Sequence, residues 1–171
     1  MTVYDDLTEE EQRLLRASLA AAAVAVSTAS PGRTEETVSE GFAAASFVLG
    51  SRAEHVSHPL VSSVIVALEA RLHAEQPFPD FVEVATAPGA REWAMDTLRS
   101  VVALLDARTA PEDAAAYKAW LMAIASTVAE AGKEEQGFLG RGGVQVNDAE
   151  RAALQEIAGV LGRDAGPTTS A

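Results

Sequence analysis

The histidines of this chain raise the question of a metal site. Two of them, His55 and His58, stand with Glu54 in the pentapeptide EHVSH, directly before an expected helix start at Pro59. Two imidazoles and a carboxylate form a donor set that divalent cations accept. We therefore take Glu54, His55 and His58 as candidate ligands of a divalent cation, the one cofactor that the sequence suggests. The alternative is that they are ordinary loop histidines, one of which caps the following helix.

A second stretch that could bind a ligand is the glycine-rich segment that ends near Gly143. Four glycines fall within residues 137–143, where backbone N–H groups could surround an anion. Their spacing matches neither GxGxxG nor GxxxxGK[ST]. Moreover, Asp148 and Glu150 lie in the first turn of the next expected helix, where their charges would repel an anion. The sequence therefore argues against a phosphate site here.

We expect instead that Phe138 and Leu139 fold into the core while the glycines permit tight turns around them. Two alternatives stay open, which are an anion site and a surface that contacts a partner or a small ligand. The candidate partner or ligand surface consists of Phe138, Leu139, Gly140, Arg141, Gly142 and Gly143.

Catalytic motifs are missing from the sequence. The chain has no cysteine, which excludes disulfides, thiolate nucleophiles and sulfur-ligated metals. It has neither a G-x-S-x-G elbow nor an HExxH motif. Its acidic clusters fall mostly at expected helix starts, where the helix dipole explains them. We assign no catalytic residue, and a non-enzymatic protein is the preferred interpretation.

The charge of the chain restricts its partners. A formal charge of -12 and a pI near 4.6 oppose attraction to nucleic acid or to anionic lipid. The N-terminal sequence MTVYDDLTEEEQ is acidic where a secretory signal is basic, and the apolar run of residues 19–26 is too short to cross a bilayer. We expect a cytoplasmic protein that binds neither nucleic acid nor membranes. A protein partner or a homodimer is the expected mode of association.

Apolar periodicity predicts an all-α fold with six to seven helices and no strand. The first helix begins at Thr8, which has capping-box spacing to Glu11, and stops before residue 30. The second runs from about Thr34 to Gly50. Its apolar positions follow three-to-four spacing at Val38, Phe42, Ala45 and Leu49. The third follows Pro59, with inward positions at Val61, Val64, Ile65, Leu68 and Leu72.

The remaining helices follow a proline-rich stretch at residues 76–89. A short helix is expected from Asp80, and a longer one from about residue 88 to 107. Pro111 begins a long helix that is expected to end near Gly132. Its apolar stripe comprises Tyr117, Leu121, Ile124 and Val128. Asn147 with Glu150 repeats the capping-box spacing before a last helix with Leu154, Ile157, Ala158 and Leu161 on its buried side.

These helices suggest a single domain over residues 1–162, built from helix-loop-helix halves at about 7–75 and 88–162. Residues 163–171 contain Gly, Pro, Thr and Ser without apolar periodicity, and we expect a disordered tail there. Both halves contain an apolar helix, a turn with glycine, a polar cap and a second apolar helix that includes VLG. An internal repeat explains this likeness, and so does the general similarity of alanine-rich helical hairpins.

The C-terminal sequence VAEAGKEEQGFLGRGGVQVNDAERAALQEIAGVLG resembles the TerB-like (tellurite-resistance protein TerB) helical family. That family has two helices joined by a turn of the form D-G-x-[VI]-[ST]-x-x-E, usually in two copies. Gly143, Val144, Val146, Asn147 and Glu150 approximate this pattern, as do Gly32 and Thr34 in the first half. The resemblance implies an all-helical fold and a link to stress response. The turn aspartate is replaced by Gly142 and Pro31, so the resemblance does not carry a metal site to this chain.

The sequence therefore predicts a binding or scaffold module of TerB-like type. Two hypotheses from other classes stay beside it. One is a divalent-metal-binding protein that uses carboxylates and His55 or His58. The other is a small-molecule enzyme with a cleft between the two halves, which would need convergent polar groups in that cleft.

Overall fold

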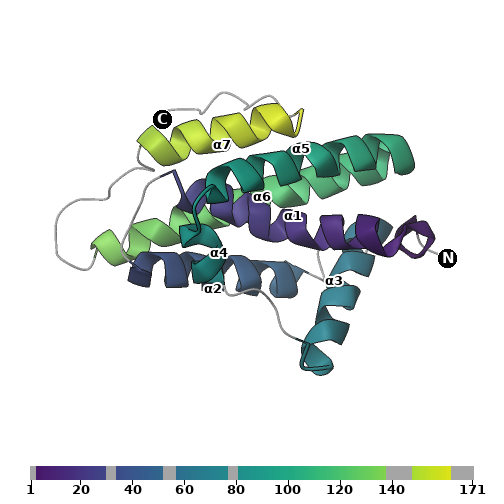
Figure 1. Ribbon diagram of the computed structural model, residues 1–171, viewed down its shortest axis with the longest axis horizontal. Coiled ribbons are helices and arrows are strands. Elements are labelled where there is room, and N and C mark those ends of the chain that lie inside the picture. The colour runs from purple at the N-terminus through teal and green to yellow at the C-terminus, as the bar shows by residue number, and fades with distance from the viewer. Residues whose placement is uncertain (1–2, 30–33, 52–56, 77–80, 138–147, 163–171) are drawn as a thin grey trace.

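The described part of the chain forms seven α-helices and one short 3-10 helix (Figure 1). The computed structural model describes residues 3–29, 34–51, 57–76, 81–137 and 148–162. The elements are η1 (Val3–Asp6), α1 (Glu9–Ser27), α2 (Thr34–Gly50), α3 (Pro59–His73), α4 (Phe81–Thr86), α5 (Ala90–Arg108), α6 (Pro111–Gly137) and α7 (Asp148–Val160). The described residues contain no strand, so the expected all-α class with six to seven helices is confirmed.

Helix α1 lies in the centre of the bundle. It begins with the expected capping box, in which the Thr8 N–H donates to the Glu11 carboxylate at 2.8 Å and the Thr8 hydroxyl accepts from the Glu11 N–H at 3.3 Å. The bond from the Thr8 N–H lowers the pKa of Glu11. Residues 21–27 are buried on every side of the helix, because α1 packs against α5, α6 and α2. Five of these seven residues are alanine or serine, which lets the neighbouring helices approach closely.

Helix α6 supplies the largest buried side chains. Tyr117 and Trp120 are almost completely buried, with their rings edge to face and their centroids 5.6 Å apart. The Tyr117 hydroxyl donates to the Leu15 carbonyl at 2.8 Å, and the Trp120 Nε1–H donates to the Ser51 hydroxyl at 3.1 Å. The helix does not end near Gly132 as expected but continues to Gly137. The intervening sequence KEEQ consists of strong helix formers, which offset the single glycine.

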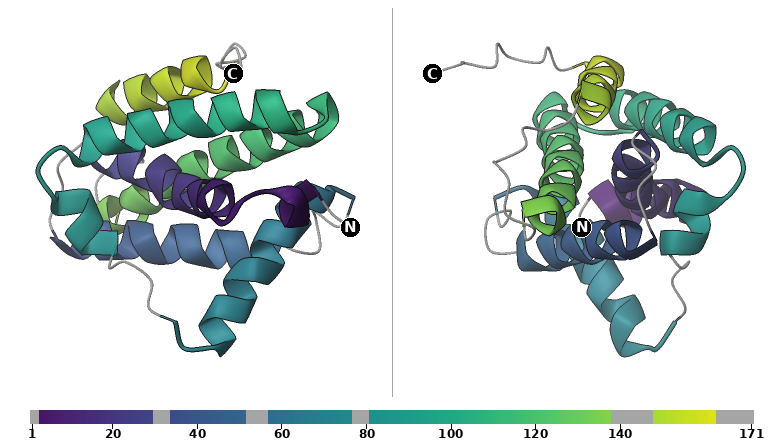
Figure 2. Two further views of the ribbon diagram at one scale, coloured as in Figure 1. Left: turned by 45° about the vertical axis from the view of Figure 1, so that its right-hand side comes forward. Right: turned by 90° about the vertical axis from the view of Figure 1, so that its left-hand side faces the viewer.

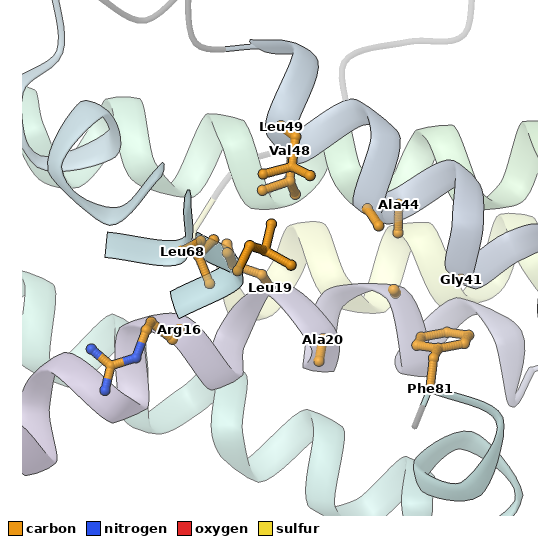
Figure 3. A pocket seen from close by; sticks show the side chains of 12 residues that line it. Arg16, Leu19, Ala20, Gly41, Ala44, Val48, Leu49, Leu68 and Phe81 are labelled. Atoms are coloured by element: carbon orange, nitrogen blue, oxygen red, sulfur yellow. The ribbon is translucent and has the colours of Figure 1, made fainter. Parts of the chain in front are cut away.

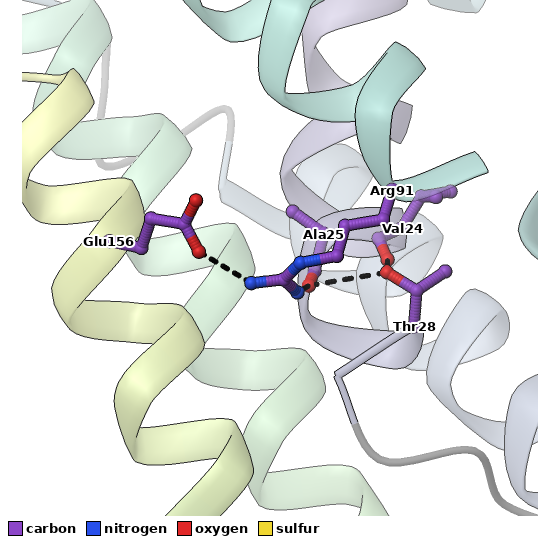
Figure 4. A network of polar contacts seen from close by, with 5 residues as sticks. All are labelled: Val24, Ala25, Thr28, Arg91 and Glu156. Atoms are coloured by element: carbon purple, nitrogen blue, oxygen red, sulfur yellow. Dashed lines mark hydrogen bonds and ion pairs between the residues drawn. The ribbon is translucent and has the colours of Figure 1, made fainter. Parts of the chain in front are cut away.

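The two expected halves pack against each other over most of their length. The most extensive contacts join α1 to α5 and α2 to α6, and α7 lies across α1, α5 and α6 (Figure 2). Arg91 of α5 links three helices, because its guanidinium donates to the Ala25 carbonyl of α1 at 3.1 Å and to Glu156 of α7 at 2.5 Å (Figure 4). The helices of one half make fewer contacts with each other than with the helices of the other half.

Helix α3 projects from the bundle at an angle (Figure 1). Its first turns pack against α6 and η1, and its buried side chains are Leu60, Val61, Val64, Ile65 and Leu68. Leu72, which the periodicity placed on the inward side, is 47% exposed because the bundle ends before the last turn of the helix. None of the described helices combines the length and the apolar character needed to span a bilayer.

Candidate binding groove

Helix α2 exposes its most apolar stripe. Phe42 is 75% exposed and Val38 is 53% exposed, and Ala45 and Leu49 are also exposed. We call these four residues the α2 stripe. A stripe at this spacing normally faces the core of a bundle. Here the core side of the helix carries smaller and more polar residues, namely Thr37, Glu40, Ala44 and Val48.

Polar contacts fix the direction in which α2 faces. Ser27, at the end of α1, donates its hydroxyl hydrogen to Glu40 at 2.5 Å, and both side chains are buried. Directly after the last residue of α2, the buried Ser51 accepts a hydrogen bond from the indole N–H of Trp120. Turning the stripe inward would break both bonds and would leave buried polar groups unsatisfied, which is costly. Hydrogen bonds at Glu40 and at Ser51 therefore determine which face of α2 points inward.

A close approach at Gly41 also fixes the helix. A Cβ atom at this position would lie 2.5 Å from Phe81 Cδ1 and 3.1 Å from Phe81 Cβ, so only glycine allows α4 to pack this closely. The Phe81 ring consequently lies against α2 (Figure 3). A glycine within a helix lowers helix stability by roughly 1 kcal/mol, and the close contact with Phe81 explains why Gly41 is present despite this cost.

An apolar groove of about 360 Å³ runs beside the α2 stripe. It is lined by α1, α2, α3 and Phe81 of α4, and Arg16 and Phe81 mark its opposite ends (Figure 3). The α2 stripe borders it, because Ala45 and Leu49 belong to both. Leu72, on the projecting helix α3, is part of the opposite wall. The groove and the stripe thus form one continuous apolar surface.

The groove can bury apolar groups but offers little chemistry. Arg16 is the one charged residue among the described residues that line it. Its guanidinium points away from the other lining side chains and donates to the Tyr4 hydroxyl at 2.5 Å (Figure 3). None of the described residues that line the groove carries a carboxylate, imidazole or hydroxyl group. Their apolar side chains are suited to contact with apolar groups of a bound molecule.

The residues predicted as sites from the sequence fall mostly outside the described part of the chain. This holds for Phe138 to Gly143, for Glu54 and His55, and for the tail at 163–171. His58 is described and takes the N-cap position of α3, as the alternative interpretation expects, although its side chain makes no capping hydrogen bond. The described residues contain no group of three His, Cys, Asp or Glu that could hold a metal ion. The divalent-cation site stays a prediction.

A second pocket of about 420 Å³ lies between the ends of α5 and α7 and the start of α6. Lys118 and Asp106 form an ion pair in its lining, at 2.6 Å. All of its lining residues come from the second half, whereas the groove is lined by the first half together with Phe81. Neither of these two pockets therefore lies between the halves, and an enzyme with a cleft at that position stays a prediction.

One feature of the sequence indicates an apolar surface on this helix, although apolar periodicity alone does not reveal it. Residues 41–50 contain no charged side chain on any face of the helix. A helix that is apolar all round is either buried or covered by another surface. This pattern indicates an interface, but it does not say which face meets the rest of the chain.

Comparison with known proteins adds no relative, because no protein-family model, curated protein or solved structure matches this chain. The TerB-like resemblance therefore remains a hypothesis from the sequence.

Proposed function

We propose that this protein is a binding module that receives a helix of a protein partner along the α2 stripe and in the adjacent groove. The observation that carries the proposal is the exposure of the α2 stripe, whose side chains form one apolar edge at helical spacing. Soluble proteins keep exposed apolar patches small, and larger ones mark sites of interaction. A helix that lays its apolar face into a groove is a common form of peptide recognition.

The dimensions of the surface suit a helix. Val38 and Leu49 are eleven residue steps apart, which corresponds to about 16 Å at a rise of 1.5 Å per residue. A partner helix of about three turns would cover that length. The groove beside the stripe would take one or two large apolar side chains of the partner, and such anchors supply most of the affinity at protein interfaces.

A small apolar ligand explains the surface less well. Such a ligand would occupy the groove, but Phe42 is not among the residues that line it. Phe42 is the most exposed large apolar side chain of the described residues. An occupant that covers it has to extend along α2 beyond the groove. We therefore assign the surface to a protein segment.

The test uses a fluorescently labelled amphipathic helical peptide with leucine and phenylalanine on one face and glutamine on the other. Fluorescence anisotropy measures its Kd for the wild-type protein, for Phe42→Ser and for Val66→Ser. Val66 is the matched control, because it is 46% exposed and lies on the side of α3 opposite Leu68. We expect Phe42→Ser to weaken binding by about tenfold or more and Val66→Ser to leave it unchanged. Equal affinity for Phe42→Ser and the wild type would contradict the proposal.

Other attributes of the module rest on the sequence. The likeness of the C-terminal region to TerB-like proteins supports a TerB-like type and a role in stress response. A contact through Phe138 to Gly143 lies outside the described residues and stays a separate prediction.

A further inference from the structure

On the basis of the proposed function, we infer that the partner helix carries a carboxylate beside its apolar face, at the end that meets Arg16. Arg16 is the one charged residue among the described residues that line the groove. It stands at one end of the groove, and Phe81 stands at the other (Figure 3). The two ends therefore differ chemically. A helix that lies along the groove meets this positive charge at only one of its own ends.

Arg16 has no carboxylate within ion-pair distance in the described part of the chain. Other arginines of the described helices do form ion pairs with a carboxylate, namely Arg91, Arg99, Arg108 and Arg151. Arg13 also lacks such a partner, but it is exposed and does not line the groove. Arg16 is half-buried, so water compensates its charge less completely. A guanidinium in this situation is suited to bind an anion from outside the chain.

The hydrogen bond to Tyr4 holds the Arg16 guanidinium in place and leaves donors for a ligand. Nη1 donates to the Tyr4 hydroxyl at 2.5 Å, and Tyr4 is itself buried. Within the described residues, Nε and Nη2 of Arg16 donate to no acceptor. These two nitrogens share one edge of the guanidinium, and a carboxylate accepts from such an edge with both of its oxygens. The donors that remain therefore match one carboxylate.

The groove sets the position of this carboxylate on the partner helix. Helix α1 lines the groove with Arg16, Leu19, Ala20 and Ala23, a span of seven residue steps or about 10 Å. The guanidinium lies beyond the apolar walls and points away from them (Figure 3). A group on the partner reaches it from past the end of the groove. The acid should therefore stand about one turn, three or four positions, beyond the last apolar residue of the partner.

The charge of -12 on the whole chain does not decide this contact. It acts at long range, and salt at about 0.15 M screens exposed charges beyond about 8 Å. A carboxylate that is hydrogen-bonded to a guanidinium lies about 3 Å away, well inside that length. Asp5 and Asp6, which follow Tyr4 in η1, form no ion pair with Arg16. A helix with a single acid at this end is thus favoured, whereas a helix that is acidic throughout would be repelled.

A long-chain fatty acid offers the same two kinds of group, an apolar chain and a carboxylate. Its chain would fill the groove, but Phe42 does not line the groove and would stay 75% exposed. A helix that carries one acid covers the α2 stripe, fills the groove and meets Arg16 together. The partner helix is therefore the better occupant, and the fatty acid becomes an outcome of the test.

The experiment compares three labelled helical peptides that share one apolar face of leucine and phenylalanine. The first carries a glutamate one turn before that face, the second carries it one turn after, and the third has glutamine at both positions. Fluorescence anisotropy gives each Kd at about 0.15 M salt, where long-range repulsion is screened. We expect at least one glutamate peptide to bind about fivefold or more tighter than the glutamine peptide. The position of that glutamate gives the direction of the bound helix.

Two variants of the protein remove the same charge at different places. Arg16→Gln acts at the end of the groove, and Arg99→Gln is the matched control, because Arg99 is exposed on α5, which does not line the groove. Arg16→Gln should abolish the advantage of the glutamate peptide and change the Kd of the glutamine peptide by less than about twofold. Arg99→Gln should preserve the advantage. Comparing variants also cancels any effect of the glutamate on the helicity of the peptide itself.

Other results overturn the inference. If no glutamate peptide has an advantage, or if the advantage persists in Arg16→Gln, the inference is wrong, and the proposed function stands while Phe42→Ser weakens the glutamine peptide. If no peptide shows binding that depends on Phe42, both are wrong. Dodecanoate serves as a competitor. If it displaces the glutamine peptide from the wild type but not from Arg16→Gln, and no glutamate peptide is favoured, Arg16 belongs to a fatty-acid site.

Light scattering decides the case of a second copy. A wild-type dimer that becomes a monomer in Phe42→Ser would assign the α2 stripe to self-association and would also overturn the inference.

Discussion

The direction in which α2 faces predicts that Phe42→Ser and Val48→Ala affect the free energy of unfolding very differently. Phe42 is 75% exposed, so only about a quarter of the roughly 1.5–3 kcal/mol for burying such a side chain is at risk. We expect Phe42→Ser to cost less than about 1 kcal/mol. Val48 is 7% exposed, and removing two buried carbons at about 0.8 kcal/mol each gives about 1.6 kcal/mol before any cavity term.

Helix propensity does not reverse this order. Phenylalanine and serine have similar propensities, and alanine in place of valine returns only about half a kcal/mol. The measurement is urea denaturation followed by circular dichroism, with both variants and the wild type showing one m-value. A result in which Phe42→Ser is the more destabilising variant would mean that the stripe faces the core. The assignment of the groove as a docking surface would then fail with it.

Three further predictions concern the packing that holds the groove. Gly41→Ala places a Cβ atom 2.5 Å from the Phe81 ring, so we expect a lower melting temperature despite a gain of about 1 kcal/mol in helix propensity; a higher one would refute the close approach. Burial raises the pKa of Tyr117, so the folded state keeps a proton that the unfolded chain releases above about pH 10. Wild-type stability should therefore fall above that pH by up to about 1.4 kcal/mol per pH unit from this group, and more steeply than in Tyr117→Phe; parallel pH profiles would contradict this. Ser51→Ala removes the acceptor of the buried Trp120 N–H and should lower the free energy of unfolding by about 1–3 kcal/mol, as measured by urea denaturation. An unchanged free energy of unfolding would mean that this bond does not fix the direction in which α2 faces.

Local signals in the sequence predict most of the helices. Thr8 and Glu11 begin α1 through bonds three residues apart, and Pro59 begins α3 through its own fixed φ angle. These features need no knowledge of the rest of the chain. The predicted end of α6 near Gly132 is wrong, because the helix formers after this glycine carry the helix onward to Gly137. The 3-10 helix η1 has no comparable signal in its sequence VYDD and was not expected.

The groove could not be predicted because distant residues determine it. The three-to-four spacing of Val38, Phe42, Ala45 and Leu49 is the same whether the stripe is inside or outside. The orientation depends instead on Ser27, Phe81 and Trp120, which come from three other helices. Periodicity describes a helix by itself, but it does not say which neighbours supply a hydrogen-bond partner or require a small residue. The candidate surface is therefore a tertiary property.

Helix α3 gives the groove one wall with a loosely held end. Its buried side chains all lie between Leu60 and Leu68, whereas the last turn around Leu72 has little of the protein against it. Segments with few buried contacts open locally at a far lower free energy than the whole fold, and their amide hydrogens exchange quickly with solvent. Amides at residues 70–74 should therefore exchange faster than those in the middle of α1. A bound partner that packs on Leu72 would hold the last turn of α3 in place and would slow this exchange. Local opening of that turn and binding in the groove are therefore coupled.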